Sequence, residues 1–388
     1  MDEFLVLISL ITAFFYGICI ISFIIGWFQK SRTSVIRGDT CPDVSVIIAA
    51  RNEEKCIGTL LRELLQQDYP AEKMEIIVVD DFSQDRTPDI VKEFINRVHG
   101  CRVCYMSNTS IKDKGKKGAL QNGIEKAKGE VIITIDADCN AGPRWVSSMV
   151  DAFVKHNARM IIGPVRIMAK NTMFSQLQAL EFSSLTASSA GALGLGYPIM
   201  CNGANLAFCR KTYYELKEKL QGKKYLSGDD VFLMLAIHKK YPGSIGFAKD
   251  HHAIVDTHAA DSLKSFLNQR MRWASKSRGY RDAAPLVVGG IVASINLLLI
   301  LLLVFALSGN MLIGKILLFM WAFKFIVDLP LLYLESRFMN NSHLLRFYPL
   351  LQIIYPFYVF IILLLSFLVP FTWKDRRQDT KKALLVGK

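Results

Sequence analysis

Four long apolar segments constrain this chain more than any other feature of its sequence. Phe4–Phe28 contains 25 residues and Pro285–Leu307 contains 23 residues without a charged side chain. Phe347–Trp373 also lacks charge but is interrupted by prolines, and Met311–Leu334 is apolar although it carries three charges. About 20 apolar residues suffice to cross a bilayer as a helix. The sequence therefore predicts an integral membrane protein with one N-terminal and about three C-terminal transmembrane segments.

The charges beside the first apolar segment indicate its orientation. Acidic Asp2 and Glu3 precede it, where a cleaved signal peptide would be basic, so we interpret it as a membrane anchor. Lys30, Arg32 and Arg37 follow it, and basic residues mark the cytoplasmic side of a membrane helix. About 245 residues then follow before the next apolar segment. We expect them to form a cytoplasmic domain, at the plasma membrane if the protein is bacterial.

These features predict an order of domains along the chain. We expect an N-terminal transmembrane helix in residues 1–30, a cytoplasmic domain in 40–260, an amphipathic interfacial helix in 261–284, a transmembrane region in 285–373 and a basic tail in 374–388. Three spans after a cytoplasmic domain would leave this tail outside, whereas its charge predicts a cytoplasmic position. Either one of the later segments does not span, or the charge rule fails for this protein.

The net charge of +13 does not by itself indicate nucleic-acid binding. Much of the excess positive charge flanks apolar segments, as in Lys264–Arg281 before the second of them and Lys374–Lys382 after the last. Anionic lipid headgroups are the ordinary partners of such residues. We therefore expect the lipid bilayer, and no nucleic acid, among the partners of this chain.

In the first part of the large domain, segments typical of buried strands alternate with segments typical of helices. Val44–Ala50, Met74–Val79 and the run from Val131 are rich in β-branched residues, and Arg102–Met106 is a further candidate strand. This alternation predicts an α/β fold with a parallel sheet and right-handed crossovers. No Gly-x-Gly-x-x-Gly motif follows the first strand and no P-loop motif occurs, so dinucleotide-binding and P-loop domains lose their main support.

Four polar clusters lie at the ends of apolar elements. They are Asp80-Asp81 after the second strand, Asp136-Ala137-Asp138 after the fourth, Asp229-Asp230 before an apolar helix, and Gln269–Trp273 on a basic helix near the membrane. Taken singly, each has a structural explanation, such as helix capping by Asp. Open α/β domains, however, bind ligands at the carboxyl ends of their strands, and paired carboxylates can hold a hard divalent cation.

The order of these clusters resembles the membrane-bound family 2 glycosyltransferases, which include the synthases of cellulose, hyaluronan and poly-N-acetylglucosamine, and ceramide glucosyltransferase. The matching stretches are Val-Ser-Val-Ile-Ile-Ala-Ala-Arg-Asn-Glu-Glu from residue 44, Val-Val-Asp-Asp-Phe-Ser-Gln-Asp from residue 78, Ile-Asp-Ala-Asp from residue 135, Gly-Asp-Asp from residue 228 and Gln-Arg-Met-Arg-Trp from residue 269. A DxD motif alone is weak, whereas the ordered set with QxxRW beside a membrane helix is specific. The resemblance covers roughly residues 44–280.

The resemblance implies a GT-A fold that binds a nucleotide diphosphate sugar, with UDP-glucose or UDP-N-acetylglucosamine as the expected donor. Asp81 would meet the uracil base, and Asp80 would support its loop. Asp136 and Asp138 would hold Mg²⁺ or Mn²⁺ on the diphosphate. The other residues implied on the nucleotide-sugar side are Ala49, Glu53, Lys116, Gln269 and Arg272.

For the transfer step, the resemblance implies that Asp230 is the general base, which would take the proton of the acceptor hydroxyl. A single displacement would invert the configuration, so an α-linked donor would give a β-linkage. On the acceptor side it implies Gly203, in the loop Cys201–Asn205, together with Asp229 and Trp273. Asp229 replaces a Glu that is commoner in the family, which leaves its contact open because Asp is shorter.

The resemblance implies a membrane-associated acceptor, either a lipid or a growing glycan. Four spans are few for one chain to enclose a polysaccharide channel, which favours a single transfer to a lipid. The alternative is a processive synthase whose pore is completed by an oligomer or an export partner. A non-catalytic nucleotide-sugar sensor or scaffold is an alternative of another class, and it would be expected to lack Asp138, Asp230 or the Arg272-Trp273 pair, all of which are present.

Overall fold

The computed structural model describes residues 2–29, 41–97, 102–108, 115–220, 229–368, 372–373 and 376–377. Most of the predicted basic tail lies outside these residues. The chain divides into two compact units. The helical unit comprises Met1–Gln29, Ala169–Ile199 and Ala259–Lys388, and the sheet unit comprises Lys30–Met168 and Met200–His258.

A seven-stranded sheet organises the described part of the sheet unit. Its spatial order is β3 (Arg102–Ser107), β2 (Met74–Asp80), β1 (Val44–Ala50), β4 (Val131–Asp136), β8 (Asn205–Cys209), β6 (Met160–Ile162) and β9 (Ile245–Phe247). Strands β1 to β4 pair in parallel, which confirms the alternation predicted for them. Strand β8 runs antiparallel to both β4 and β6, so the sheet as a whole is mixed rather than parallel.

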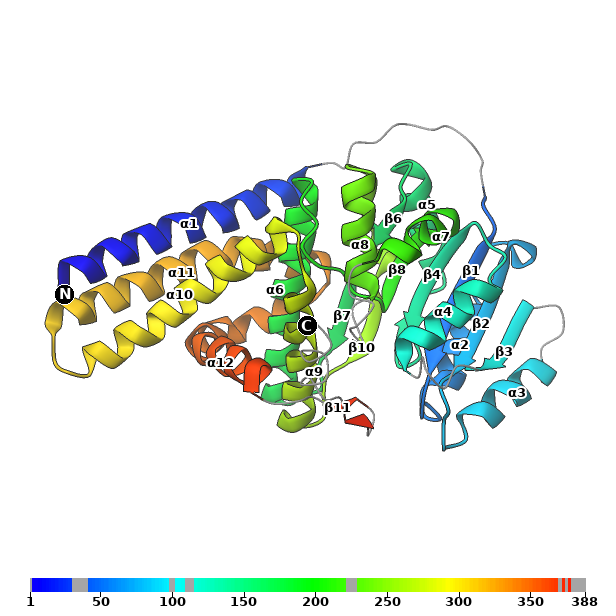
Figure 1. Cartoon of the computed structure of the whole chain (residues 1–388). Coiled ribbons are helices and arrows are strands. Elements are labelled where there is room, and N and C mark those ends of the chain that lie inside the picture. Colours follow the sequence, from blue (N-terminus) through cyan, green and yellow to red (C-terminus); the bar gives the residue numbers. More distant parts are fainter. Residues whose placement is uncertain are drawn as a thin grey trace, which may run out of the picture. The chain divides into compact units, whose positions relative to one another are not determined.

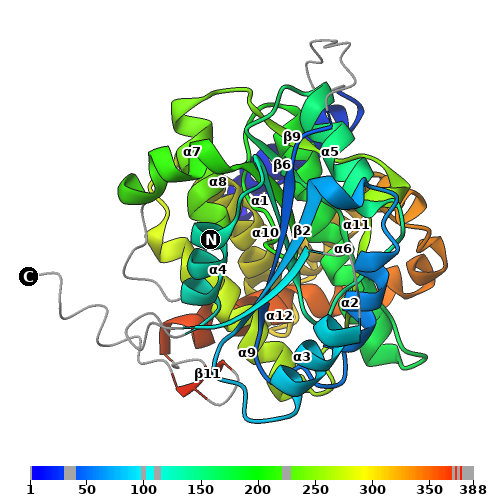
Figure 2. The same cartoon turned by 90° about the vertical axis from the view of Figure 1, so that its right-hand side faces the viewer.

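Helices cover both faces of this sheet. Their bounds are α2 (Ile57–Leu65), α3 (Thr87–Arg97), α4 (Lys116–Lys126), α5 (Trp145–Lys155), α7 (Arg210–Leu216) and α8 (Asp229–Lys240). Figure 2 shows α4, α7 and α8 on one side of the strands and α2, α3 and α5 on the other. The sequence dictates this burial, because α2 places apolar residues at helical spacing and its Ile57, Leu60, Leu61 and Leu64 are all buried.

A smaller sheet and several short 3₁₀ helices complete the sheet unit. The smaller sheet has the order β5 (Asn140–Ala141), β10 (Val255–His258) and β7 (Val165–Met168). The 3₁₀ helices are η1 (Ala71–Lys73), η2 (Lys217–Lys219) and η3 (His251–Ala253). The sequence predicts one strand in each of two segments, Arg159–Met168 and Gly246–Asp256. Each instead contributes to two strands that belong to different sheets.

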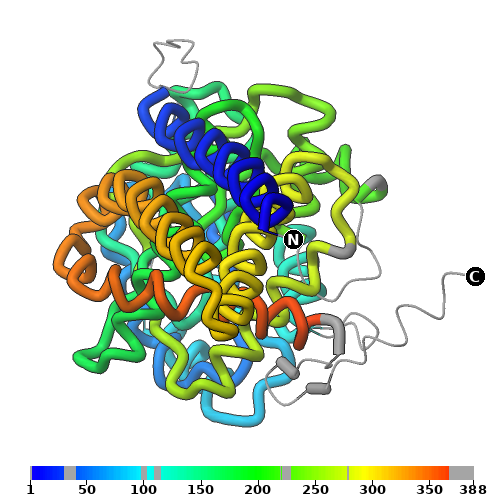
Figure 3. The backbone as a smooth tube through the Cα atoms, turned by 90° about the vertical axis from the view of Figure 1, so that its left-hand side faces the viewer, coloured from blue at the N-terminus to red at the C-terminus, as the bar shows by residue number. Residues whose placement is uncertain are grey.

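Among the described residues, four helices are long and apolar enough to cross a membrane, as judged by length and composition. They are α1 (Asp2–Phe28), α10 (Ala283–Ala306), α11 (Met311–Phe338) and α12 (Tyr348–Leu368), the last preceded by η5 (Ser342–Phe347). Helices α1, α10 and α11 pack against one another (Figures 1 and 3). The expectation of one N-terminal and three C-terminal apolar helices is confirmed.

The helical unit also contains elements from the middle of the chain. They are α6 (Met173–Gly194), α9 (Leu263–Ser275) and η4 (Lys276–Gly279), and the hairpin β11 (Thr372–Trp373) and β12 (Arg376–Arg377) follows near the C-terminus. Helix α6 packs closely on α1, and glycines allow this approach. A Cβ atom added at Gly26 would lie only 2.0 Å from the carbonyl oxygen of Gly191. Sequence reasoning included α6 in the domain of residues 40–260. The predicted domain 40–260 was defined by its expected catalytic function, and its boundaries stay a prediction.

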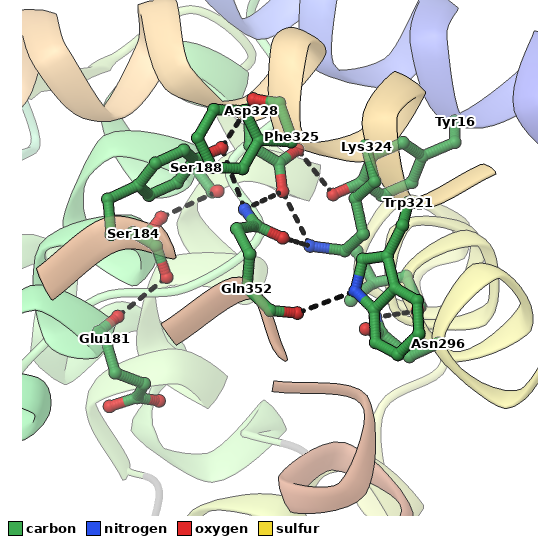
Figure 4. Close-up of polar contacts among 12 residues, drawn as sticks. Tyr16, Glu181, Ser184, Ser188, Asn296, Trp321, Lys324, Phe325, Asp328 and Gln352 are labelled. Atoms are coloured by element: carbon green, nitrogen blue, oxygen red, sulfur yellow. Dashed lines mark hydrogen bonds and ion pairs between the residues drawn. The ribbon is translucent and has the colours of Figure 1, made fainter. Parts of the chain in front are cut away.

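A buried polar cluster joins three of the apolar helices (Figure 4). Lys324 of α11 is 2% exposed, and its Nζ donates to Asp328 Oδ2 at 2.7 Å and to Gln352 Oε1 of α12 at 2.8 Å. Tyr16 of α1 donates its hydroxyl to Asp328 Oδ1 at 2.6 Å. Charged residues in membrane helices are tolerated when they pair with one another inside the bundle. This pairing explains how the apolar segment from Met311 can carry Lys324 and Asp328.

We expect Lys324→Met to destabilise the helical unit strongly, because it leaves the half-buried Asp328 carboxylate inside the helix bundle without its counter-charge. Breaking a buried ion pair from one side costs about 3–5 kcal/mol. The double variant Lys324→Met/Asp328→Leu should recover much of this loss. Thermal unfolding in detergent measures the effect, with Lys315→Met, an exposed position on the same helix, as the control. Equal melting temperatures for Lys324→Met and the control would contradict the stabilising role of the pair.

Candidate active site

The strand register brings the predicted acidic residues to one edge of the main sheet. Ala50 at the end of β1 lies opposite Asp80 at the end of β2, and Ala49 lies opposite Asp136 at the end of β4. Strand β1 therefore separates the two carboxylates, and the chain winds in opposite directions on its two sides. This is a topological switch point, where open α/β domains bind ligands.

The loops that follow β1 and β2 hold each other in place. Arg51 Nη1 donates to the carbonyl oxygens of Asp81 and Phe82 at 2.6 and 2.9 Å. Asn52 receives a hydrogen bond from the Gln84 amide at 2.9 Å, and its own N–H donates to Ser83 Oγ at 2.9 Å. Such paired contacts order both loops before any ligand binds.

Asp80 and Asp81 occupy different positions within this edge. Asp81 is 1% exposed, and its Oδ1 accepts from Asn108 Nδ2 at 2.9 Å and from the Gly115 amide at 3.0 Å. Asp81 thereby ties the start of α4 to the ends of the strands. Asp80 accepts from the Ser83 amide at 3.3 Å, while its Oδ1 is buried without a hydrogen-bond partner among the described residues. The Asp81 side chain is therefore already hydrogen-bonded within the protein. Its direct contact with the uracil base of a nucleotide stays a prediction.

Two adjacent lysines at the start of α4 reach two acidic sites. Lys116 forms a close ion pair with Asp136, and Lys117 Nζ lies 2.8 Å from Asp229 Oδ1. Sequence reasoning singled out Lys116 but missed Lys117. The signal was the doubled lysine between Gly115 and Gly118, because glycine-flanked basic residues at a helix start can face an anion. Lys117 also supplies a contact for Asp229, which the sequence left open.

Asp230 lies at the start of α8, and two backbone N–H groups orient its carboxylate. Its Oδ2 accepts from the Gly203 amide at 3.1 Å, and its Oδ1 accepts from the Val231 amide at 2.9 Å. The Gly203 carbonyl in turn accepts from Thr134 Oγ1 of β4 at 2.8 Å. A chain of contacts thus runs from the strand that ends in Asp136, through Gly203, to Asp230. Thr134 is a second residue that sequence reasoning missed, because a threonine inside an apolar strand usually only packs.

Asn205, at the end of the predicted acceptor-side loop, is structural. It has no exposed surface, and its Nδ2 donates to the carbonyl oxygens of Pro164 and Ala253, both at 2.7 Å. Its Oδ1 accepts from Trp145 Nε1 at 3.0 Å. With its amide group satisfied in this way, Asn205 connects the strand β8 to two neighbouring loops.

The donor set at this edge fits a metal ion that is shared with a phosphate group. Asp138 and Asp136 are half-buried, and among the described residues no three His, Cys, Asp or Glu side chains gather as a metal cage. Burial, with the nearby Asp136 and Asp138 carboxylates, raises the pKa of the Cys139 thiol, so this thiol stays protonated and is a poor ligand. Mg²⁺ commonly takes one or two protein carboxylates and completes its shell with phosphate and water. Two carboxylates are therefore sufficient for an ion of this kind.

The remaining predicted residues have distinct placements. Ala49 and Glu53 are partly exposed beside the strand ends, and the Glu53 amide donates to Thr87 Oγ1 at 2.8 Å. Gln269, Arg272 and Trp273 lie on α9 in the helical unit. The structure thus brings the predicted residues of the sheet unit to one sheet edge. The QxxRW residues lie together on the single helix α9, which belongs to the helical unit.

Comparisons with known proteins agree with this architecture. The family model described as Glycosyl transferase family 2 matches residues 45–216, and the model described as Glycosyl transferase family group 2 matches residues 131–373. The chain is similar to a mannosyltransferase from Pyrobaculum calidifontis, solved in complex with GDP-mannose and Mn²⁺, with a TM-score of 0.62 at 17% identity. That likeness covers 97% of this chain and 100% of the other, and it shows the fold.

Curated relatives match shorter parts of the chain. A probable glycosyltransferase of Bacillus subtilis, YdaM, is 29% identical over 243 residues, which is 60% of this chain and 54% of that protein. A β-monoglucosyldiacylglycerol synthase of Trichormus variabilis is 31% identical over 147 residues, which is 37% of this chain and 30% of that protein. This chain therefore spans about half the length, or less, of these two relatives.

Proposed function

This chain belongs to the family 2 glycosyltransferases, and from that membership we propose that it moves a sugar from a nucleotide diphosphate sugar to a membrane-associated acceptor, with inversion. The observation that carries the proposal is the gathering of Asp80, Asp136, Gly203 and Asp230 at one edge of the sheet. We propose UDP-glucose or UDP-N-acetylglucosamine as the donor.

The residues of the first strand ends form the nucleotide side of the proposed site. Ala49, Glu53, Asp80 and Asp81 would line the nucleoside pocket, since they follow β1 and β2 at the switch point. The ammonium group of Lys116, at the start of α4, would move from Asp136 to the incoming diphosphate. Gln269 and Arg272 would add to the diphosphate side, where the planar guanidinium suits phosphate oxygens.

Asp138, assisted by Asp136, would hold the Mg²⁺ or Mn²⁺ ion implied by the family. The bound ion supplies positive charge that stabilises the leaving diphosphate. Asp136 ends β4 and Asp138 follows it, and the half-buried position of both carboxylates supports this assignment because it leaves them within reach of a ligand. Asp230 is not assigned to the metal ion, and its carboxylate is oriented instead by two backbone N–H groups.

Asp230 would act as the general base of the transfer. Its carboxylate takes the proton from the acceptor hydroxyl while that oxygen attacks the anomeric carbon of the donor. The bond from that carbon to the diphosphate breaks in the same displacement, so an α-linked donor gives a β-linked product. A positioned base of this kind accelerates a reaction by about 10²- to 10⁴-fold. Asp229, held by Lys117, and Trp273 would contact the acceptor.

We propose a lipid acceptor and a single transfer. The four candidate spans among the described residues are few for enclosing a polysaccharide channel, and a relative bears the name of a synthase of a glycosylated diacylglycerol. The catalytic domain would face the cytoplasm, since basic residues follow α1. A reporter fused to the C-terminus would locate the basic tail relative to the membrane.

Product analysis tests the proposed function. Membranes that contain the protein are incubated with radiolabelled UDP-glucose, UDP-N-acetylglucosamine or GDP-mannose and with vesicles of diacylglycerol in phosphatidylcholine. We expect one nucleotide sugar to label a small, solvent-extractable glycolipid. A labelled polymer would instead support the processive alternative. Absence of transfer from every nucleotide sugar, with and without diacylglycerol and Mn²⁺, would contradict the proposal.

A further inference from the structure

The two arginines of the segment Gln269–Trp273 have different surroundings in the helical unit. Arg270 is 3% exposed, whereas Arg272 is partly exposed. The QxxRW pattern assigns roles to Gln269, Arg272 and Trp273 but none to Arg270. A buried guanidinium is costly unless it is paired and hydrogen-bonded, so its contacts indicate what it does.

Arg270 has a buried carboxylate as its partner. Its Nη2 forms a close ion pair with Glu181 Oε2 of α6, and Glu181 is itself 4% exposed. The hydroxyl of Tyr358 in α12 donates to Glu181 Oε1 at 3.0 Å. Three helices, α6, α9 and α12, therefore meet at one buried carboxylate.

Arg270 also contacts two of the motif residues directly. Its Nη1 donates to Gln269 Oε1 at 2.7 Å. Its Cζ lies 4.2 Å from the centroid of the Trp273 ring, within the range of a cation–π contact. The Trp273 ring further packs against Phe182 of α6, with 5.8 Å between ring centroids. One guanidinium thus holds both the amide of Gln269 and the ring of Trp273.

We propose that Glu181 and Arg270 are a positioning pair for the transfer reaction. Glu181 fixes the guanidinium of Arg270, and Arg270 sets the orientation of the Gln269 amide and the Trp273 ring. The inference rests on the proposed function, which assigns Gln269 to the diphosphate and Trp273 to the acceptor. A buried ion pair adds little stability over apolar packing of similar volume, so orientation is the effect that distinguishes this pair.

The double variant Glu181→Leu/Arg270→Met separates positioning from stability. It replaces the pair with apolar side chains of similar volume, and such exchanges commonly preserve folding. We expect the melting temperature to stay near the wild-type value and the KM for the donor to stay within about twofold. We expect kcat to fall by about 100-fold, since a displacement of about 1 Å has an effect of that size. Unchanged kcat in the folded double variant would overturn the proposal.

A second readout is independent of activity. The protein is labelled with 5-fluorotryptophan, and the fluorine resonance of Trp273 is assigned by its absence in Trp273→Phe. We expect one sharp resonance in the wild type, and a broadened or split resonance in the double variant because the ring is no longer held. A single sharp resonance in the double variant would overturn the positioning role. If the wild type transfers no sugar, the proposed function fails, and this measurement still decides whether the pair orients Trp273.

Ile362→Ala provides a control of matched location. Ile362 of α12 is 8% exposed and packs against Met271 of α9, the residue after Arg270. The substitution loosens the same pair of helices without touching the ion pair, so we expect a lower melting temperature with a kcat within about twofold of the wild type. A loss of kcat equal to that of the double variant would attribute the effect to helix packing and overturn the proposal. If the double variant does not fold, Arg270→Lys is judged by the same two readouts, since it keeps a positive charge beside Glu181 but lacks the planar guanidinium that contacts both Gln269 and Trp273.

Discussion

Asp230→Asn should lower the turnover number for sugar transfer by about 10²- to 10⁴-fold, because the amide cannot take the proton of the acceptor hydroxyl. Nucleotide affinity should stay within about twofold of the wild type, since Asp230 lies on the acceptor side of the proposed site. The amide oxygen of Asn can still accept from the Gly203 or the Val231 amide, so we expect the fold to persist. Transfer kinetics and calorimetric binding of UDP measure the two effects.

Asp89→Asn is the matched control for this prediction. Asp89 lies in the first turn of α3, as Asp230 lies in the first turn of α8, and it is exposed. The control makes the same chemical change at a helix start away from the strand ends, so we expect wild-type turnover. If Asp230→Asn and the control have equal turnover numbers, Asp230 is not the general base.

Asp138→Ala should lower turnover by about 10³-fold, whichever nucleotide sugar serves as donor. A metal ion at the leaving diphosphate contributes several kcal/mol to the transition state, and about 1.4 kcal/mol corresponds to each tenfold in rate. The side chain is half-buried directly after β4, so its removal should leave the melting temperature close to that of the wild type. Transfer kinetics at increasing Mn²⁺ measure the loss.

A binding measurement separates metal loss from other defects in Asp138→Ala. In the wild type we expect Mn²⁺ to increase the affinity for UDP, and in the variant we expect this increase to disappear. Asp89→Ala should behave as the wild type in the same titration. If Asp138→Ala keeps both the turnover and the Mn²⁺ dependence, the DxD segment holds no metal ion.

Much of the site follows from local sequence patterns. β-Branched runs predict buried strands, and acidic residues directly after them must lie at strand ends. The parallel pairing of β1 with β2 and β4 then places Asp80 and Asp136 at one edge, as the register confirms. The pairing of Lys117 with Asp229 could not be predicted in this way, since the partners lie 112 positions apart in the sequence and no periodicity links them.

Other parts of the fold depend on contacts between distant segments. The sequence did not predict the strand β8, which begins at Asn205, and the antiparallel direction of this strand is decided by its pairing with β4 and β6. The α6 segment contains no long apolar run. It joins the helical unit because Gly26 and Gly191 allow their backbones to approach closely. Such close approach is a property of two surfaces, and neither surface reveals it alone.

By itself, the sequence determined that this chain has four apolar segments, an α/β domain and an ordered set of acidic motifs, because these features follow from composition and spacing over short distances. The tertiary structure alone decided which distant side chains pair with or hydrogen-bond to the buried charged groups. Lys324 meets Gln352 and Tyr16 meets Asp328 across the apolar helices, and Arg270 meets Glu181 across 89 residues of sequence. The physical reason is that a buried charge needs a partner in space, and only the packing of helices brings such partners together.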